Sequence, residues 1–442
     1  MHFNSFRLSS LAKTFLHYIV PTVISMWIFA FYTIVDGFFV ARGVGPDALA
    51  AVNLSMPFNN FIFAAGLLFA TGTSTVLSFS LGEGSLEKAR ELFSQNLFLV
   101  ALLGLLIGAA VLCSLESVAL FLGATEVTLE YVKGYVKWIA VFAVFFIVSY
   151  NLEVQVKANG APQITALGVG ACGMANIVLD YIFVIRLGWG VEGASLATGL
   201  SQAISTAIFL IYFLTHRKTL RIQRFHWRLS IYRQIIKIGI PNCFMELASG
   251  MTIFLFNMVI LRVIGNDGVI CYTVLAYIFT FAANTMSGIT QGMQPLVSFH
   301  CGAGDHDTFR RLLKYGILSV FACSVFMVAG LTFFGKYAVG IFLEAQYRSL
   351  FNATISALRL YDLSFLLMGY NILISGFLTA INHPEYSLVI SLCRSLVFLF
   401  ISLTVMSAIL GETGIWLSAF VSEAMCLVVT AALYRNWKKR YF

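Results

Sequence analysis

The chain has 442 residues, of which 59% are hydrophobic and only 11% are charged, and its formal net charge is +8. Soluble domains carry about 25% charged residues, so this composition excludes a soluble globular protein. The positive charge is not a nucleic-acid signature, because the basic residues lie in short connections and at the end of the chain, where membrane proteins carry them beside lipid headgroups. We expect a chain that lies in a lipid bilayer and binds no nucleic acid.

Apolar runs long enough to cross a bilayer follow one another through the whole sequence. Crossing the hydrocarbon takes about 20 apolar residues per helix, and backbone groups in lipid must bond within their own segment. Twelve transmembrane helices are predicted, at residues 14–41, 50–80, 92–113, 134–157, 163–185, 193–214, 238–262, 268–298, 315–343, 360–381, 387–410 and 414–434. The expected fold class is therefore an all-α membrane protein.

A basic segment divides the chain into two apolar halves. Residues 215–237 contain seven Lys or Arg residues and no acid. With both termini inside, the inner segments hold 19 Lys or Arg and the outer segments hold eight, and such an excess marks the cytoplasmic side. We predict an N-terminal six-helix lobe at 1–214, a cytoplasmic connecting loop at 215–237, a C-terminal six-helix lobe at 238–434 and a cytoplasmic tail at 435–442.

The two halves are copies of each other. A shift of 220 residues superimposes special residues without a gap, among them Pro21 and Pro241, Gly72 and Gly292, and Arg90 and Arg310. Because each half has an even number of spans, the copies share one orientation. They should form two parallel six-helix bundles related by a pseudo-two-fold axis along the membrane normal, with a central cleft between them.

Acidic residues inside the predicted spans are the first functional candidates, because an unpaired charge in hydrocarbon costs several kcal/mol. There are five, namely Asp36, Glu153, Asp180, Glu246 and Glu423. Tyr32 precedes Asp36 by one helical turn, and Asn176 precedes Asp180 by one turn, so each acid has a polar neighbour on its own face. Asp36 and Asp180 both lie in the outer half of their spans and can share a depth.

The remaining acids lie nearer the inner side or carry a simpler interpretation. Glu153 shares the fourth span with Asn151 and Gln155, and Glu246 lies about two turns after the proline of the seventh span. For each acid the alternative is a hydrogen bond that only fixes helix packing. For Glu423 and Arg394, a structural ion pair between the last two spans is the favoured interpretation.

The ionisable residues are not repeated along with the fold. The position that matches Asp36 in the second half is Phe256, and the position that matches Glu246 in the first half is Met26. We therefore expect one asymmetric site, weighted toward the first half. The sequence has no P-loop, GxSxG, HExxH or paired CxxC motif, and its eight cysteines are scattered, so we expect neither an enzyme nor a bound cofactor.

Taken together, the twelve spans, the two parallel repeats, Pro21, Pro241 and the segment VDGFFVARGVGPDALAA after the first span resemble the multidrug and toxic compound extrusion (MATE) family. The sequence is most similar to its bacterial MepA-like and DinF-like branches. That resemblance implies a polar cluster in the N-terminal lobe, made here by Asp36, Asn176, Asp180 and Thr198, with Glu153 as a further acid. In the NorM-like branch, acids lie on spans seven and ten; Glu246 matches the first, and the tenth span has no mid-span acid.

The expected function is a secondary antiporter, a monomer of the bacterial cytoplasmic membrane, that exports small organic cations in exchange for H⁺ or Na⁺. The expected ion-coupling residues are Asp36, Asp180, Asn176, Thr198 and Glu153, of which the first four would hold Na⁺. The expected substrate-binding residues are Asp36, Tyr32, Asn151, Glu153, Gln155, Asp180 and Glu246. The alternatives are a flippase for a lipid-linked precursor, which would favour a basic cavity, and a channel or receptor.

Overall fold

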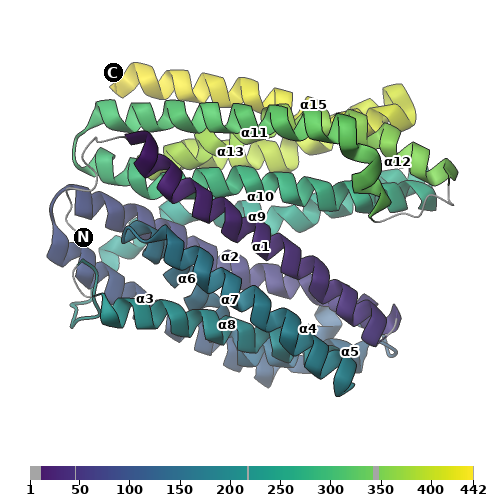
Figure 1. Ribbon diagram of the computed structural model, residues 1–442, viewed down its shortest axis with the longest axis horizontal. Helices are drawn as coiled ribbons and strands as arrows, with labels where there is room; N and C mark the ends of the chain where they lie inside the picture. Colours follow the sequence, from purple (N-terminus) through teal and green to yellow (C-terminus); the bar gives the residue numbers. More distant parts are fainter. Residues whose placement is uncertain (1–10, 45, 217–218, 342–347, 442) are drawn as a thin grey trace.

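The computed structural model describes residues 11–44, 46–216, 219–341 and 348–441, and this part of the chain is helical and contains no strand (Figure 1). The first half contains α1 (Leu11–Gly43), α2 (Pro46–Gly82), α3 (Leu86–Cys113), α4 (Leu115–Phe121), α5 (Leu129–Val141), α6 (Ala143–Ala158), α7 (Pro162–Asp180), the π-helical η2 (Tyr181–Arg186) and α8 (Gly190–Thr215). The second half contains α9 (Leu229–Val263), α10 (Asn266–Gly302), α11 (His306–Gly340), α12 (Arg348–Tyr361), the 3-10 helix η3 (Asp362–Ser364), α13 (Phe365–Ala380), α14 (Pro384–Leu392), the π-helical η4 (Cys393–Val397) and α15 (Phe398–Tyr441).

The described residues contain ten helical stretches long and apolar enough to cross a membrane, and the pair α5 and α6, bent by 52°, makes an eleventh. One of the ten, Pro384–Lys439, has 56 residues and would be about 84 Å long if straight. It folds back at Gly411, whose φ is 57° and ψ is −130°. The Ser402 hydroxyl donates to the backbone oxygen of Ser418 at 3.0 Å, so the two arms lie side by side. The prediction of twelve crossings is therefore confirmed, although the fourth crossing is bent and not straight.

Each half has its own hydrophobic core, but the first helix of each half begins in the core of the other. Phe15 and Ile19 of α1 pack with the second-half core, whereas Tyr232 and Ile235 of α9 pack with the first-half core. Phe15 and Ile235 are equivalent positions of the repeat. Figure 1 shows α1 running obliquely across the molecule between the two sets of helices. The lobes are thus joined by a reciprocal exchange of helix ends.

The lobes touch most closely at the end of the bundle where α1 and α9 begin. A Cβ atom added to Gly72 of α2 would overlap the carbonyl oxygen of Ile235, and one added to Gly239 of α9 would overlap that of Leu68. At the ends of α2 and α10, Gly82 meets the backbone of Phe299 and Gly302 meets that of Phe79. Glycine is required at these positions because the helix backbones are in direct contact and leave no room for a Cβ atom. These crossings close one end of the interface between the lobes.

The substitution Gly239→Ala is expected to push α2 and α9 apart and to open that end of the molecule. Overpacking of this kind costs about 1–3 kcal/mol, which shifts a two-state equilibrium roughly five- to 150-fold. The distance between spin labels on the two lobes would measure the shift. Gly330→Ala is the control, because nothing lies within 4 Å of an added Cβ there. Equal distance distributions in the two variants would contradict this role of Gly239.

Candidate functional site

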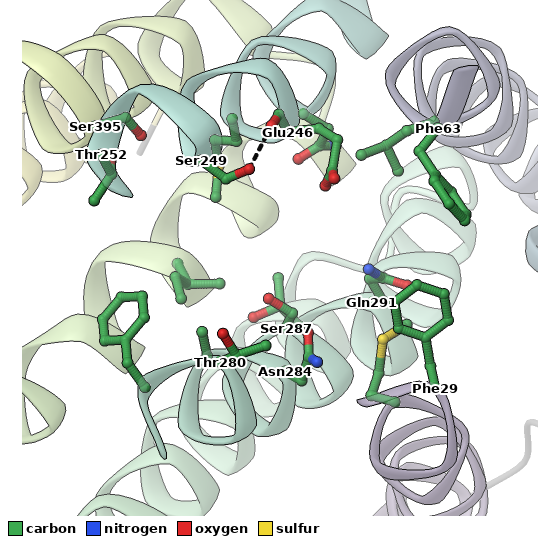
Figure 2. A pocket seen from close by; sticks show the side chains of 18 of the residues that line it. Phe29, Phe63, Glu246, Ser249, Thr252, Thr280, Asn284, Ser287, Gln291 and Ser395 are labelled. Carbon is green, nitrogen blue, oxygen red and sulfur yellow. Dashed lines mark hydrogen bonds between the residues drawn. The ribbon is translucent and has the colours of Figure 1, made fainter. Parts of the chain in front are cut away.

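A cavity of about 470 Å³ lies between the two lobes, with walls from both (Figure 2). On the first-lobe side Phe29 and Phe63 supply aromatic surface, and on the second-lobe side Glu246 lies one turn from Ser249. A polar stripe of α10 also faces the cavity, and it consists of Thr280, Asn284, Ser287, Gln291 and Gln294. These positions are three or four residues apart, so they share one helical face. The sequence analysis considered charged residues and so did not identify this stripe. The stripe could have been found from its uncharged polar residues, which recur every three or four positions in an apolar span.

Three carboxylates and one guanidinium line the cavity, those of Glu153, Glu246, Glu423 and Arg394. Arg394 and Glu423 form the expected ion pair, with an Nη2 to Oε1 distance of 2.8 Å. The Asn371 amide donates to Oε2 of Glu423 at 2.8 Å, and the Thr430 hydroxyl donates to Asn371 at 2.9 Å. This buried network neutralises one of the three acids. Arg394 and Glu423 also face the cavity. The sequence analysis predicted the ion pair between them but not this position on the cavity wall.

Glu153 is neutralised as well, by Lys157, the last residue of the predicted fourth span. Lys157 is only 1% exposed, because α6 continues for one turn beyond the acid. Its Nζ lies 3.0 Å from Oε1 of Glu153. The same Nζ lies 3.5 Å from Oε1 of Gln291 on α10, so the ion pair reaches the other lobe. Glu153 is therefore part of a buried pair at the lobe interface.

Glu246 is the cavity carboxylate without a cationic partner. No Lys, Arg or His among the described residues lies within ion-pair distance of its oxygens. The contact drawn in Figure 2 is made by its backbone oxygen, which accepts a hydrogen bond of 2.7 Å from the Ser249 hydroxyl. A desolvated carboxylate needs a counter-charge. The cavity thus presents one carboxyl group, on the α9 wall, that no described basic side chain neutralises.

The four residues expected to hold the coupling ion come together, but outside this cavity. The carboxyl groups of Asp36 and Asp180 lie close enough to interact, and the Asn176 amide donates to the Thr198 hydroxyl at 3.4 Å. Asp180 and Asn176 are completely buried. The π-helical turn η2 begins directly after Asp180, and such turns are frequent at functional sites.

Several oxygen atoms of this cluster have no hydrogen-bond partner within the described part of the chain. They are Oδ1 of Asp36, both carboxylate oxygens of Asp180 and Oδ1 of Asn176. Two adjacent buried carboxyl groups repel each other when both are charged. The pair is stable when it shares a proton, which removes one charge, or when it holds a cation. The donor set of carboxylate, amide and hydroxyl oxygens fits a proton or a hard cation such as Na⁺. No group of three or more His, Cys, Asp or Glu side chains gathers in the described residues.

Tyr32 links the cavity to this cluster. It lines the cavity, and its hydroxyl lies near Asp36, Glu153 and Gln202. Asp36 follows Tyr32 by one helical turn, so the tyrosine, which lines the cavity, shares a helical face with one carboxyl group of the pair. Gln202 also lines the cavity.

Asn151 and Gln155, two of the expected substrate-binding residues, do not line the cavity. The Asn96 amide donates to Oδ1 of Asn151 at 2.9 Å, and the Gln155 amide donates to the backbone oxygen of Ala70 at 3.3 Å. Both residues are buried and fasten α6 to α3 and α2. Of the expected substrate-binding residues, the structure places Tyr32, Glu153 and Glu246 on the cavity wall, whereas Asp36 and Asp180 lie behind it.

Comparison with known proteins agrees with this architecture. The family model MatE matches residues 21–182 and 241–406. The multidrug export protein MepA of Staphylococcus aureus strain bovine RF122 is 26% identical over 95% of this chain and 93% of its own, and MepA of Staphylococcus saprophyticus is also 26% identical, with the same coverage. A MATE transporter crystallised in complex with MaL6 superposes with a TM-score of 0.91 and 23% identity, over 96% of this chain and 97% of its own. An outward-facing multidrug resistance MATE transporter gives a TM-score of 0.90 at 24% identity, over 96% and 97% of the two chains.

Proposed function

Because the chain belongs to the MatE family, we propose that it is a secondary antiporter, not an enzyme, which exports small organic cations in exchange for H⁺ or Na⁺. The observation that carries this proposal is the cavity between the lobes, whose acid Glu246 has no cationic partner among the described residues. The relatives named for multidrug export cover nearly the whole chain. Two lobes around one cavity are what alternating access requires.

In this proposal the organic cation and the coupling ion use separate sites. The cation binds in the cavity, with its positive charge beside Glu246 and its flat apolar part against Phe29 and Phe63. The coupling ion binds at Asp36 and Asp180, behind Tyr32. Occupation of the second site would move Tyr32 and change the cavity wall, which couples the two sites through one side chain.

We further propose that the protein works as a monomer in the bacterial cytoplasmic membrane, with both termini in the cytoplasm. The excess of basic residues on the connecting loop and tail supports this orientation. The end of the interface closed by glycine contacts would then face the cytoplasm, so that the described state releases substrate to the outside. That end carries Gly82 and Gly302.

The direct test is transport of a fluorescent organic cation by the purified protein in lipid vesicles. A pH gradient or a Na⁺ gradient is imposed separately, and the rate of cation movement is recorded. Acceleration by one gradient identifies the coupling ion. Movement that neither gradient accelerates, together with the absence of counterflow, would overturn the antiporter.

The substitution Glu246→Gln is expected to weaken binding of a monovalent organic cation about ten- to a hundredfold. The loss corresponds to one hydrogen bond or contact to a charged group, about 1.5–3 kcal/mol. Binding of a neutral analogue of the same shape should change little. Fluorescence titration in detergent measures both, and Glu116→Gln, an exposed acid on α4, is the control. An unchanged affinity for the cation would place its charge elsewhere in the cavity.

A flippase for a lipid-linked precursor is the weaker alternative. A pyrophosphate headgroup would need a basic cavity. The wall carries three carboxylates against the single guanidinium of Arg394, which is already paired with Glu423.

A further inference from the structure

The end of the second lobe carries a basic groove that shares no lining residue with the cavity between the lobes. It lies between the beginning of α11 and the end of α15, with a volume of about 780 Å³. Its charged residues are Asp307, Arg310, Arg311, Lys314 and Lys438. Tyr434 and Trp437 form its aromatic wall, and Ile317 forms its apolar edge. Both helices pack against α13, and the start of α11 and the end of α15 border the groove.

The equivalent groove of the first lobe shows what such a surface holds. There the groove lies between α3 and α8, and the connecting segment fills it. Leu220 of that segment is completely buried, and the Arg90 guanidinium donates to the backbone oxygen of Thr219 at 2.7 Å. Further along, the backbone N–H of Gln223 donates to the Ser94 hydroxyl at 3.0 Å. The chain itself therefore occupies the first groove.

Acidic residues of α3 hold that occupant, which is basic. Glu91 lies 3.3 Å from Arg228 of the segment, and Glu87 accepts a hydrogen bond of 3.3 Å from Gln223. The Glu91–Arg228 ion pair thus adds charge complementarity to the backbone contacts and the buried leucine that hold this segment in the first groove.

In the second copy the charge of the groove is reversed. The position of Glu91 is occupied by Arg311, and that of Ser94 by Lys314, at the same shift of 220 residues. Asp307 replaces Glu87 and keeps its place beside the following arginine, at 4.0 Å from Arg310 where Glu87 lies 2.7 Å from Arg90, so the charge difference between the grooves rests on Arg311 and Lys314. The basic segment that fills the first groove would be repelled here. The reversed charge requires an anionic occupant.

The groove opens onto the lipid-facing surface of α11. The next turns carry Ile317, Leu318 and Phe321, which are 37%, 64% and 54% exposed. A basic mouth flanked by tryptophan and tyrosine, above an exposed apolar strip, matches the headgroup and the acyl chains of a phospholipid. We propose that this groove binds one phospholipid with an anionic headgroup. Its phosphate contacts Arg311, Lys314 and Lys438, and its acyl chains lie along the apolar strip of α11.

The bound lipid would join α11 to α15 in the second lobe, as the connecting segment joins α3 to α8 in the first. It contributes to the integrity of the lobe and not to the substrate cavity. The proposal is therefore independent of the antiport function, and it is tested by lipid binding and not by transport.

The experiment compares lipid retention by the full chain in native mass spectrometry. Phosphatidylglycerol and phosphatidylcholine with the same acyl chains are titrated against the wild type and the double variant R311Q/K314Q. The control is R435Q/K439Q, which removes the same charge from exposed residues near the same helix end that do not line the groove. Inorganic phosphate is added as a competitor, and size-exclusion chromatography checks that each variant is monodisperse.

The groove variant is expected to bind phosphatidylglycerol about 30-fold more weakly than the wild type, since each basic residue near an anionic headgroup contributes somewhat more than a fivefold factor. Phosphatidylcholine binding should be weak and unchanged, and the control should match the wild type. If both double variants lost phosphatidylglycerol binding equally, the lipid would be held by general surface charge and not by the groove, and the proposal would be wrong. Equal retention of the two lipids by the wild type, or displacement by millimolar inorganic phosphate, would also overturn the proposal.

Discussion

Replacing Asp36 or Asp180 by Asn is expected to abolish gradient-driven export while the protein still inserts and folds. The two carboxyl groups are neighbours in a buried cluster, and several of their oxygens lack a hydrogen-bond partner in the described residues. An amide can neither take up a proton nor neutralise Na⁺, so the coupling site would no longer change its charge. Removal of an uncompensated buried carboxylate should not destabilise the fold. We expect the transport rate in lipid vesicles to fall by about a hundredfold or more, as is typical when a group acting in the rate-determining cycle is lost.

The control for this prediction is Asp267→Asn, an exposed acid in the first turn of α10. Substrate binding in detergent separates the coupling site from the cavity, because Asp36→Asn should bind the organic cation nearly as well as the wild type. Normal coupled transport by both aspartate variants would remove this pair from the mechanism. Loss of binding together with transport would instead place the cation itself at Asp36.

Replacing Arg394 by Leu is expected to destabilise the second lobe by about 3–5 kcal/mol, because it leaves Glu423 charged and buried without its partner. Arg394 contacts both carboxylate oxygens of Glu423, at 2.8 and 3.1 Å. Replacing both residues by Leu should recover most of this loss, since no isolated charge remains. Thermal unfolding followed by tryptophan fluorescence would measure the difference.

The exposed Arg262, at the end of α9, provides the matched arginine-to-leucine control. If Arg394→Leu unfolds at the same temperature as Arg262→Leu, the ion pair does not stabilise the lobe. If the double variant is no more stable than the single variant, packing and not charge explains the loss.

Hydropathy and the repeat predict the course of the chain well, because length and apolarity alone decide which segments can cross a bilayer. The grouping of Asp36 with Asp180 also follows from sequence, since both acids lie at similar depth and each follows a polar residue by one turn. The extent of the cavity does not. Tyr32 and Asp36 share a helical face, and hydropathy does not indicate that the cavity reaches Tyr32 but not Asp36.

Two further features depend on details finer than a hydropathy pass resolves. Lys157 lies at the end of a span, where one helical turn decides between an aqueous connection and a buried ion pair. The polar stripe of α10 contains amides and hydroxyls such as Asn284 and Gln291, which carry no charge and hardly lower the hydropathy of the span. Only the opposing wall, known from the structure, shows that these groups face a common space.

The exchange of helix beginnings between the lobes has a consequence for biogenesis. Phe15 and Ile19 are inserted with the first half of the chain, but Ile19 packs against Gly292 of α10, which is made roughly 270 residues later. During synthesis the start of α1 is therefore exposed to lipid until its partner helix is made. The first half reaches its final packing only when α10 has entered the bilayer. A ribosome that stalls within the connecting segment would leave behind a six-helix fragment with an unmatched leading helix, which membrane quality control can recognise.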